Sequence, residues 1–421
     1  MTFHNLSILE NKKRHVIFGS GNAGIVIMDI LPFEFTYFVD NDSSKWNKKL
    51  NEHIILPPDT LLKENKNDLV VIVASMYYEE ISKQLIEMGF EENVHYINGL
   101  KQFYYPHYYY PFRNLKNYTS VKKLLEDNSI VVADIGAGGG LNQRWEQSTL
   151  NHYKAILFEP DVEEFKKLNL SKNENCIVIN SALSDSSKII DFHICEEQPC
   201  SSIYYPNTSF LERYHAETQK NTDPHEIKKT IKIIADSLDQ LLTVNNIITE
   251  VDFIKIDTQG SELDILKGAE HSLKEAIGIE VEVEFAPYYE NQPLFPEVHN
   301  FVTKFDLELI DLRKSYWKRK LVEKGKYNGK GQLIWGDALY FKTPEKLINK
   351  NFSQQKIIRA IFVYIAYGYF EFAEVLLKLA SEHKILSEEN QRLLIPLFIN
   401  ENINIINQYV NSNKADILGN L

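Results

Sequence analysis

Glycines and acidic residues follow two hydrophobic stretches at spacings that suit a ligand site. The first stretch, residues 130–135, runs into a turn that holds Gly136, Gly138 and Gly140. Glycine at alternate positions lets a ligand approach the backbone closely. Glu159 ends the second stretch, 19 residues after Gly140, and its two oxygens are placed to accept both hydroxyls of a ribose. The spacing predicts a nucleoside pocket.

Asp134 narrows the chemical class of the expected ligand, because this carboxylate lies on the strand itself. The phosphates of a dinucleotide prefer backbone N–H groups and a helix N-terminus to a carboxylate. A carboxylate suits a cationic ligand, and S-adenosylmethionine (SAM) carries both an ammonium and a sulfonium. We therefore expect Asp134 and the glycine turn to hold the methionine end of SAM, and Glu159 its ribose. The alternative is an ordinary strand-to-helix turn that Asp134 caps.

Asp257 is the first candidate for a catalytic base, since it directly follows the hydrophobic stretch 252–256. Methyl transfer from a sulfonium requires the in-line approach of a nucleophile, so positioning supplies much of the rate. A sugar hydroxyl has a high pKa and benefits from a general base within hydrogen-bond distance. The alternative roles of Asp257 are to cap the backbone or to orient SAM.

Glu280, Glu282 and Glu284 occupy every second position of a further hydrophobic stretch. Strict alternation places them on one face of a strand, although a central parallel strand is normally buried on both faces. Since an unpaired buried carboxylate is costly, these acids need partners or water. We expect Glu282 and Glu284 at the pocket rim, where either acts as base or binds acceptor hydroxyls. The alternative is that Glu280 and Glu282 are solvated or pair with Lys255 and Lys267.

Parallel strands have to position these side chains. Hydrophobic stretches alternate with helical ones, as in a doubly wound α/β domain, and predict strands at 130–134, 155–158, 176–179, 252–256 and 277–285. Ligands of open α/β sheets lie outside the carboxyl ends of the strands. Pro160, Ser181 and Ala182 follow two of these ends, so we add them to the cofactor-binding candidates.

Several motifs of this region resemble those of FkbM-type methyltransferases. They are the stretch 255–262 (KIDTQGSE) with 266–269 (LKGA), and the segments 158–160 (FEP), 182–185 (ALSD) and 336–341 (GDALYF). The resemblance extends over about residues 130–342. It implies the class I methyltransferase fold, SAM as methyl donor, and O-methylation, commonly of hydroxyls on sugars or secondary metabolites.

The N-terminal region holds a second glycine pattern. A short apolar stretch leads into a G-x-G-x-x-G turn of Gly19, Gly21 and Gly24, and a later stretch ends at Asp40. Such glycines allow close approach of phosphates, and the acid suits a ribose hydroxyl. The pattern predicts a small Rossmann-like module with a second nucleotide site, for a nucleotide or nucleotide-sugar. A module that serves only packing or dimerisation is the equal alternative.

These patterns divide the chain into four parts and predict an α/β fold with two doubly wound Rossmann-like domains. We expect a Rossmann-like module at 1–100, a tyrosine-rich linker and lead-in helix at 101–128, the methyltransferase domain at 129–344 and a helical region at 345–421. The insert between Gln198 and Lys229 suits a lid or acceptor loop.

The C-terminal region carries apolar residues at helical spacing over 357–367, 369–383 and 390–410. We expect these helices to pack on the rest of the chain or to form a homo-oligomer interface.

Composition excludes some partners. The net charge of −12 argues against nucleic acid and anionic membranes. Three cysteines without metal-ligand spacing suit a reduced, cytoplasmic protein. The sequence shows no apolar stretch of membrane-spanning length and no signal peptide. No His/Asp cluster has convincing metal spacing, so we expect no metal.

The sequence therefore favours a SAM-dependent O-methyltransferase that acts on a sugar, a cell-surface glycan or a nucleotide-sugar. One alternative is a nicotinamide-dependent oxidoreductase or epimerase that uses Gly19–Asp40. The other is a non-catalytic protein whose N-terminal module senses a nucleotide-sugar.

Overall fold

The computed structural model describes residues 12–31, 33–100, 118–138, 140–141, 152–214, 223–247, 250–322 and 330–398, together with Leu9 and Trp145. This part of the chain divides into two compact units, one within the first 100 residues and one from residue 118 onward. Each unit is considered by itself. The tyrosine-rich stretch 103–112 and the part of the predicted helix 390–410 beyond residue 398 lie outside the described residues.

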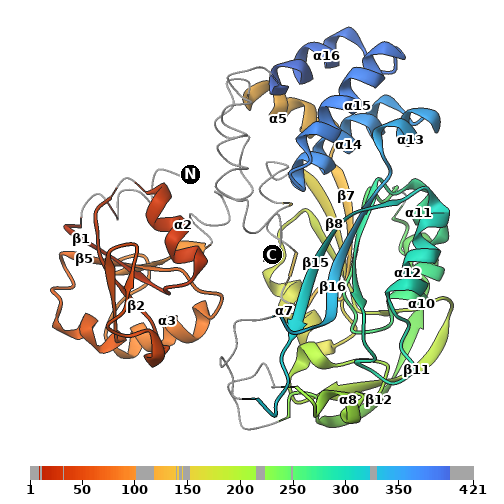
Figure 1. Cartoon of the computed structure of the whole chain (residues 1–421). Coiled ribbons are helices and arrows are strands. Elements are labelled where there is room, and N and C mark those ends of the chain that lie inside the picture. Colours follow the sequence, from red (N-terminus) through yellow and green to blue (C-terminus); the bar gives the residue numbers. More distant parts are fainter. Residues whose placement is uncertain are drawn as a thin grey trace. The chain divides into compact units, whose positions relative to one another are not determined.

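The first unit contains a doubly wound sheet with the strand order β3-β4-β2-β1-β5-β6 (Figure 1). Its strand pairs are parallel except β3 with β4. The strands are β1 (Arg14–Phe18), β2 (Phe35–Val39), β3 (Lys49–Leu50), β4 (His53–Leu56), β5 (Leu69–Val73) and β6 (Tyr96–Asn98). The helices are α2 (Asn22–Ile30) and α3 (Tyr78–Glu87), with 3₁₀ turns η1 (Ser43–Lys45) and η2 (Pro58–Lys63). Every residue of β5 is buried, as expected of a central parallel strand.

The second unit is built on a seven-stranded sheet with the order β15-β16-β14-β13-β7-β8-β9. Five strands are parallel, and β16 runs antiparallel between β14 and β15. The strands are β7 (Ile130–Ile135), β8 (Tyr153–Phe158), β9 (Cys176–Ile179), β13 (Phe253–Ile256), β14 (Gly278–Glu284), β15 (Glu308–Trp317) and β16 (Gln332–Phe341). All five strands predicted from the sequence are present, which confirms the doubly wound arrangement.

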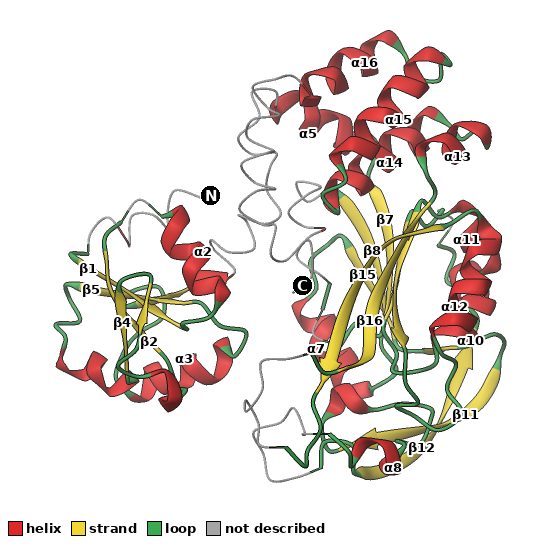
Figure 2. Ribbon diagram, viewed as in Figure 1, coloured by secondary structure: helices red, strands yellow, loops and turns green. Residues whose placement is uncertain are grey.

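Helices cover this sheet. Figure 2 shows α10, α11 and α12 along one face. The helices of the central region are α5 (Tyr118–Asp127), α7 (Val162–Ser171), α9 (Leu238–Val244), α10 (Glu262–Lys267), α11 (Glu270–Glu275) and α12 (Phe295–Val302), followed by the 3₁₀ turn η6 (Thr303–Phe305). Aliphatic side chains of β13 and β14 pack between them and form the main core, so the strand ends are held rigidly.

A three-stranded sheet that the sequence analysis did not predict lies near the carboxyl ends of the main strands (Figure 1). Its order is β10-β12-β11, with β10 (Ala182–Leu183), β11 (Lys188–Cys195) and β12 (Ile227–Asp236). The segment between β11 and β12 carries the 3₁₀ turn η5 (Gln198–Cys200) and helix α8 (Thr208–Leu211). The predicted insert is thus anchored between two paired strands.

The C-terminal helices pack at the opposite end of the sheet (Figure 1). They are α13 (Pro344–Asn349), α14 (Gln354–Ala366), α15 (Phe370–Glu382) and α16 (Glu388–Leu394), followed by η7 (Ile395–Phe398). Tyr367 stacks on Phe253 of β13 with ring centroids 4.8 Å apart. The helices therefore belong to the same compact unit as the sheet. Within the described ranges, every helix is too short or too polar to cross a membrane.

Candidate active site

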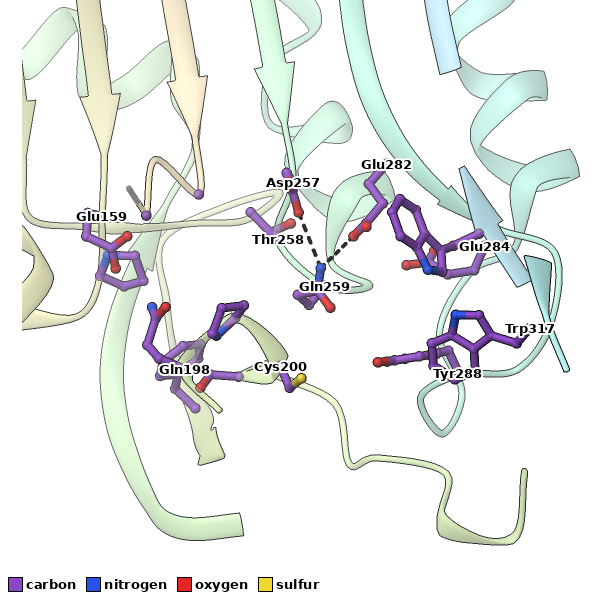
Figure 3. Close-up of a pocket in the computed structure, with 17 residues that line it drawn as sticks. Glu159, Gln198, Cys200, Asp257, Thr258, Gln259, Glu282, Glu284, Tyr288 and Trp317 are labelled. Atoms are coloured by element: carbon purple, nitrogen blue, oxygen red, sulfur yellow. Dashed lines mark hydrogen bonds between the residues drawn. The ribbon is translucent and has the colours of Figure 1, made fainter. Parts of the chain in front are cut away.

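A cavity of about 370 Å³ opens at the carboxyl ends of β7, β8, β13 and β14 (Figure 3). Its volume falls in the range of small-molecule sites, about 300–1,000 Å³. Seven predicted site residues line it, namely Gly136, Gly138, Glu159, Pro160, Asp257, Glu282 and Glu284. The structure thus brings residues from four strand ends together, as the position of ligands in open α/β sheets predicts.

Gly136 and Gly138 have no side chain, and the two glycines serve different purposes in the turn after β7. Gly136 has φ 80°, and a Cβ there would lie 1.9 Å from the carbonyl oxygen of Asp257. Only glycine fits between the ends of β7 and β13 at this point. At Gly138, a Cβ would meet its nearest neighbour, Glu159 Oε2, at 3.7 Å. The backbone at Gly138 is therefore open toward the cavity.

Glu159 lies at the end of β8 with 3% of its surface exposed. Its Oε1 accepts a hydrogen bond of 2.8 Å from the backbone N–H of Asp161, at the start of α7. Burial raises the pKa of Glu159 to about 7, and the hydrogen bond from Asp161 opposes this rise. A pair of ribose hydroxyls would supply the donors that stabilise its ionised form.

Asp134 lies outside the residues that line the cavity and is 2% exposed. Lys255 Nζ is 3.6 Å from Asp134 Oδ1 and 3.5 Å from Asp257 Oδ2. Burial raises the pKa of Asp134 to about 6 although Lys255 opposes the rise. Burial by itself would lower the pKa of Lys255, but the two carboxylates outweigh burial and raise it. Asp134 thus pairs with the lysine that contacts Asp257, and its contact with SAM stays a prediction.

Gln259 joins two of the candidate catalytic carboxylates. Its Nε2 donates to Glu282 Oε2 at 2.7 Å and to Asp257 Oδ1 at 3.3 Å (Figure 3). The backbone of Gln259 is left-handed, with φ 59°. Two contacts hold it there, since Ser202 Oγ donates to its carbonyl at 2.6 Å and Tyr289 OH donates to its Oε1 at 3.0 Å. Strained backbone of this kind persists only where the surroundings over-determine it.

Glu282 and Glu284 are 8% and 4% exposed. Burial raises the pKa of Glu282 well above its usual value, and the neighbouring Asp257 and Glu284 add to the rise. Burial likewise raises the pKa of Glu284, with Glu262 and Asp257 adding to it. Among the ion pairs of the described residues, none involves Glu282 or Glu284 with a basic partner. Burial thus opposes the ionisation of both carboxyls, and hydrogen bonds donated by a ligand would favour their ionised forms.

Glu280 pairs with Arg313, a partner that the sequence analysis did not propose. Arg313 of β15 reaches Glu280 at 3.3 Å, and Lys267 pairs with Asp264 at 3.0 Å. The reason is the antiparallel insertion of β16 beside β14, which brings β15 and its arginine close to β14. This pairing depends on strands far apart in sequence.

Ser181 and Ala182 line a smaller cavity of about 40 Å³ next to the first. Gly136 and Pro160 belong to both, and the remaining wall is mostly aliphatic, including Ile190 and Ile233 of the three-stranded sheet. Gly140, with φ 92°, lines neither cavity. Its contact with SAM stays a prediction.

Several residues of the cavity wall were not among the predicted site residues. Gln198, Pro199, Cys200 and Ser201 come from the insert, and the far end is closed by Tyr288, Trp317 and Trp335. His225 of the insert is hydrogen-bonded to Tyr288 OH at 2.5 Å. The only signal in the sequence was the length and polarity of the insert. The tryptophans lie in strands whose pairing depends on the whole sheet.

The second glycine pattern forms a tight turn at the start of α2. Gly19 has φ 115° and a Cβ there would lie 2.5 Å from Ala74 O, while one at Gly24 would lie 2.2 Å from Gly19 O. Asp40 is already engaged, since it accepts from Ser20 N at 2.9 Å and from Lys45 Nζ at 3.0 Å. Burial opposes its ionisation, but the hydrogen bonds outweigh burial and lower the pKa of Asp40.

Metal ligands do not gather in the part of the chain that the structure describes: no group of three or more His, Cys, Asp or Glu side chains there could hold a metal ion. The cavity residues do fit SAM. The open backbone at Gly138 lies beside a carboxylate with one oxygen, Glu159 Oε2, turned toward it. These groups suit the two ends of a nucleoside with an attached amino acid.

Comparison with known families supports this assignment. Residues 134–309 match the family described as methyltransferase FkbM domain. Residues 11–94 match the C2185-like N-terminal domain. The redox-sensing transcriptional repressor Rex of Carboxydothermus hydrogenoformans is 31% identical over 97 residues, which cover 20% of this chain and 47% of Rex. The chain thus spans about half the length of that relative.

Solved structures with similar regions include methyltransferases. The precorrin-6y C5,15-methyltransferase of Geobacter metallireducens is 9% identical, covering 53% of this chain and 87% of that one, with a TM-score of 0.24. The O-methyltransferase of Bacillus cereus with SAH is 13% identical, covering 53% and 81%, with a TM-score of 0.25. The family match contains Glu159, Asp257 and the motif 255–269. The chain therefore carries a SAM-dependent methyltransferase domain of the FkbM family behind a C2185-like N-terminal domain.

Proposed function

We propose that this chain transfers a methyl group from SAM to a hydroxyl of a sugar, most simply one of a glycan. The observation that carries the proposal is the bridge formed by Gln259, which ties Asp257 to Glu282 within the cavity that Glu159 also lines. Cofactor-binding and acceptor-binding groups thus share one cavity. Aromatic rings at its far end suit the apolar face of a sugar ring.

The cofactor end consists of the glycine turn and Glu159. When bound there, SAM supplies an electrophilic methyl group. Glu159 would bind the ribose hydroxyls, and the open backbone at Gly138 would lie along the methionine end. The small aliphatic cavity beside Ser181 and Ala182 supplies an apolar surface for the base. Holding these parts in place provides the orientation on which methyl transfer depends.

The acceptor end consists of the three carboxyls. Asp257 is the base in this proposal, because its side chain is 37% exposed and Lys255 lies 3.5 Å away, whereas the other two are deeply buried. It would take the proton of the acceptor hydroxyl as the oxygen attacks. Glu282 and Glu284 would accept hydrogen bonds from neighbouring hydroxyls.

A methylation screen tests the proposal. The purified chain is incubated with SAM and with glycans, free sugars and nucleotide-sugars, and methylation is read by mass. Asp257→Asn should lower kcat at least about 100-fold, with SAM affinity within twofold, because a general base contributes about 10²–10⁴-fold. The matched control is Asp191→Asn, an exposed aspartate of β11 that pairs with Lys232. Full activity of Asp257→Asn at every pH would contradict its role.

The substitution Glu159→Ala tests the cofactor-binding role of Glu159 independently of the acceptor. SAM affinity, measured by calorimetry, should fall at least about tenfold, which corresponds to about 1.4 kcal/mol. Glu163→Ala on α7 is the control because its side chain is exposed. Unchanged SAM affinity in Glu159→Ala would refute the ribose role.

For the N-terminal unit we propose a bound nucleotide or nucleotide-sugar at the turn Gly19–Gly24. The support is the glycine turn at the start of α2, whose N-cap residue Gly21 supplies no side-chain cap to the helix N-terminus. A Cβ at Gly21 would meet no atom within 4 Å, so Gly21→Val should block a ligand without disturbing the fold. Titration with NAD and with nucleotide-sugars, compared between the whole chain and Gly21→Val, tests this. Absence of heat with every nucleotide would favour a packing role.

We place the enzyme in a reducing compartment such as the cytoplasm. Cys176, Cys195 and Cys200 form no disulfide bond, and burial raises the pKa of Cys195 to about 11 and that of Cys200 to about 12. Cys200 lines the cavity, so an oxidised form would change the acceptor end.

A further inference from the structure

Trp317 closes the far end of the cavity. It ends β15, and its ring lies beside that of Tyr288 (Figure 3). The Trp317 and Tyr288 ring centroids are 5.3 Å apart at 65°, and Tyr214 packs on Trp317 at 5.9 Å. These contacts fix the orientation of the indole. Trp317 is therefore a rigid wall and not a side chain free to turn toward solvent.

The indole nitrogen of Trp317 has an unsatisfied hydrogen bond. Trp317 is 9% exposed, and its Nε1 is buried without a hydrogen-bond partner. An indole N–H can only donate, and leaving a buried donor unpaired costs about 1–3 kcal/mol. An orphaned group in a cavity wall indicates a missing ligand atom. That atom has to be a hydrogen-bond acceptor.

The carboxyls at the same end of the cavity require a ligand group that donates hydrogen bonds. Glu282 and Glu284 line this end, and both are more than nine-tenths buried without a basic partner among the described residues. None of the described residues that line the cavity is Lys, Arg or His. A ligand here must donate to carboxylate oxygens, and it meets no positive charge.

These two requirements discriminate between classes of acceptor. A phosphate or carboxylate group only accepts hydrogen bonds when ionised, and the surrounding acids repel it. An ammonium group only donates, so it leaves Trp317 unpaired. A hydroxyl donates and accepts at once. The rings of Tyr288, Trp317 and Trp335 add an apolar surface for the C–H face of a ring that carries such hydroxyls.

Resting on the methyltransferase function proposed above, we infer that the acceptor group inside the cavity is a neutral ring with at least two hydroxyls. One hydroxyl is methylated beside Asp257. A second accepts from Trp317 Nε1 and donates to Glu284, and so sets which hydroxyl reaches the methyl group. Any charged part of the acceptor, such as the phosphates of a nucleotide-sugar, lies outside the cavity. Trp317 is thus a specificity-determining residue.

Indole ¹⁵N–H resonances test this directly. The chain has four tryptophans, Trp46, Trp145, Trp317 and Trp335, and Trp317→Phe assigns the resonance of Trp317. The whole chain, saturated with S-adenosylhomocysteine, is titrated with methyl pyranosides of fucose, rhamnose, mannose and glucose. Inorganic phosphate is the anionic probe and ethanolamine the cationic one.

We expect a saturable downfield shift of the Trp317 resonance with at least one neutral pyranoside and none with the phosphate or the amine. A larger Trp317 shift with either charged probe overturns the inference. Absence of a shift with every probe overturns it too, and the methylation screen then decides the proposed function by itself.

Trp317→Phe and Trp335→Phe form a matched pair, since both keep a ring in the wall. Affinity for the pyranoside should fall at least tenfold in Trp317→Phe and less than threefold in Trp335→Phe, with SAM affinity unchanged in both. A sugar that is methylated equally well by Trp317→Phe overturns the inference and leaves the proposed function intact. A sugar that shifts Trp317 but is never methylated supports the inference and refutes the proposed function.

Discussion

Glu284 is 4% exposed in a cavity wall that it shares with Glu282 and Asp257. A carboxyl there is unfavourable for folding and useful for binding, since burial raises its pKa and leaves hydrogen-bonding capacity for a ligand. The residues that bind the acceptor are therefore expected to lower the stability of the fold.

The pH dependence of stability should show this cost. Burial raises the pKa of Glu159 and of Glu262 to about 7, so the folded chain binds more protons than the unfolded chain from their usual pKa upward. The free energy of unfolding should therefore fall as pH rises from about 4.5 to about 7. Thermal unfolding measured between pH 5 and pH 8 checks this. A stability that rises across that window would contradict it.

Glu284→Gln should remove part of that cost. Because the amide has no charge to bury, we expect the free energy of unfolding at pH 7.5 to rise by about 1–3 kcal/mol. The gain over wild type should grow with pH, and methyl transfer should weaken. Urea unfolding at pH 5 and pH 7.5 measures both. Glu297→Gln, at the start of α12, is a control for the loss of one charge at a capping position. Equal gains at the two pH values would argue against a charge effect.

Gln259 positions the carboxyls without touching the acceptor in this scheme. Gln259→Glu replaces a donor between Asp257 and Glu282 by a third carboxylate, and like charges raise each other's pKa. The acid limb of the kcat profile should move to higher pH, with SAM affinity within twofold. Gln240→Glu adds the same charge on the exposed side of α9 and should leave the profile unchanged. An unshifted acid limb in Gln259→Glu would rule out the positioning role.

At the scale of elements, the turn between β7 and the cavity depends on two glycines for different reasons. Gly136 is packed against the end of β13, whereas Gly138 borders on open space. The fold requires glycine at position 136, whereas ligand binding requires it at position 138. Substitutions at the two positions therefore separate stability from binding.

Gly136→Ala should destabilise the chain by about 1–3 kcal/mol, since it combines a left-handed φ with a contact that cannot be relieved. Gly138→Ala should leave the unfolding midpoint within about 1 °C, because the free-energy change is a few tenths of a kcal/mol, yet lower SAM affinity. Thermal unfolding and calorimetry on both variants measure this. A stable Gly136→Ala with normal SAM affinity would contradict the packing argument.

At the scale of the whole molecule, ion pairs link the C-terminal helices to the central sheet. Asp252, fully buried before β13, lies 2.9 Å from Lys356 Nζ and accepts from Arg359 Nε at 2.9 Å, both of α14. It also accepts from Val131 N at 2.8 Å. One carboxylate thus joins β7, β13 and the helices, so the helical region is part of the folding unit of the methyltransferase domain.

Asp252→Ala should leave Lys356 as a buried cation with weaker partners and destabilise the second unit by about 3–5 kcal/mol. Glu250→Ala removes a carboxylate near the same two cations that is 54% exposed, and should cost less than about 1 kcal/mol. Urea unfolding of the whole chain compares them. Similar losses for the two variants would show that the ion pair does not hold the helices in place.

Local spacing in the sequence determined the parallel strands, the glycine turn and the strand-end residues Glu159 and Asp257. These features depend on stretches of a few residues, because a hydrophobic run followed by glycine or acid predicts its own structure. The family resemblance over residues 130–342 likewise follows from short motifs, and the match at 134–309 confirms it.

Only the tertiary structure decided which residues complete the cavity. Trp335 of β16 pairs with Glu284 of β14, β15 brings Trp317 to the same wall, and the segment that follows β11 brings Gln198 there. Asp134 pairs with Lys255 through the register of β7 with β13. Pairing between distant strands is set by the packing of the whole sheet, which no local pattern encodes. The sequence thus identified the residues that line the cavity at four strand ends, and the fold alone assembled the rest of its wall.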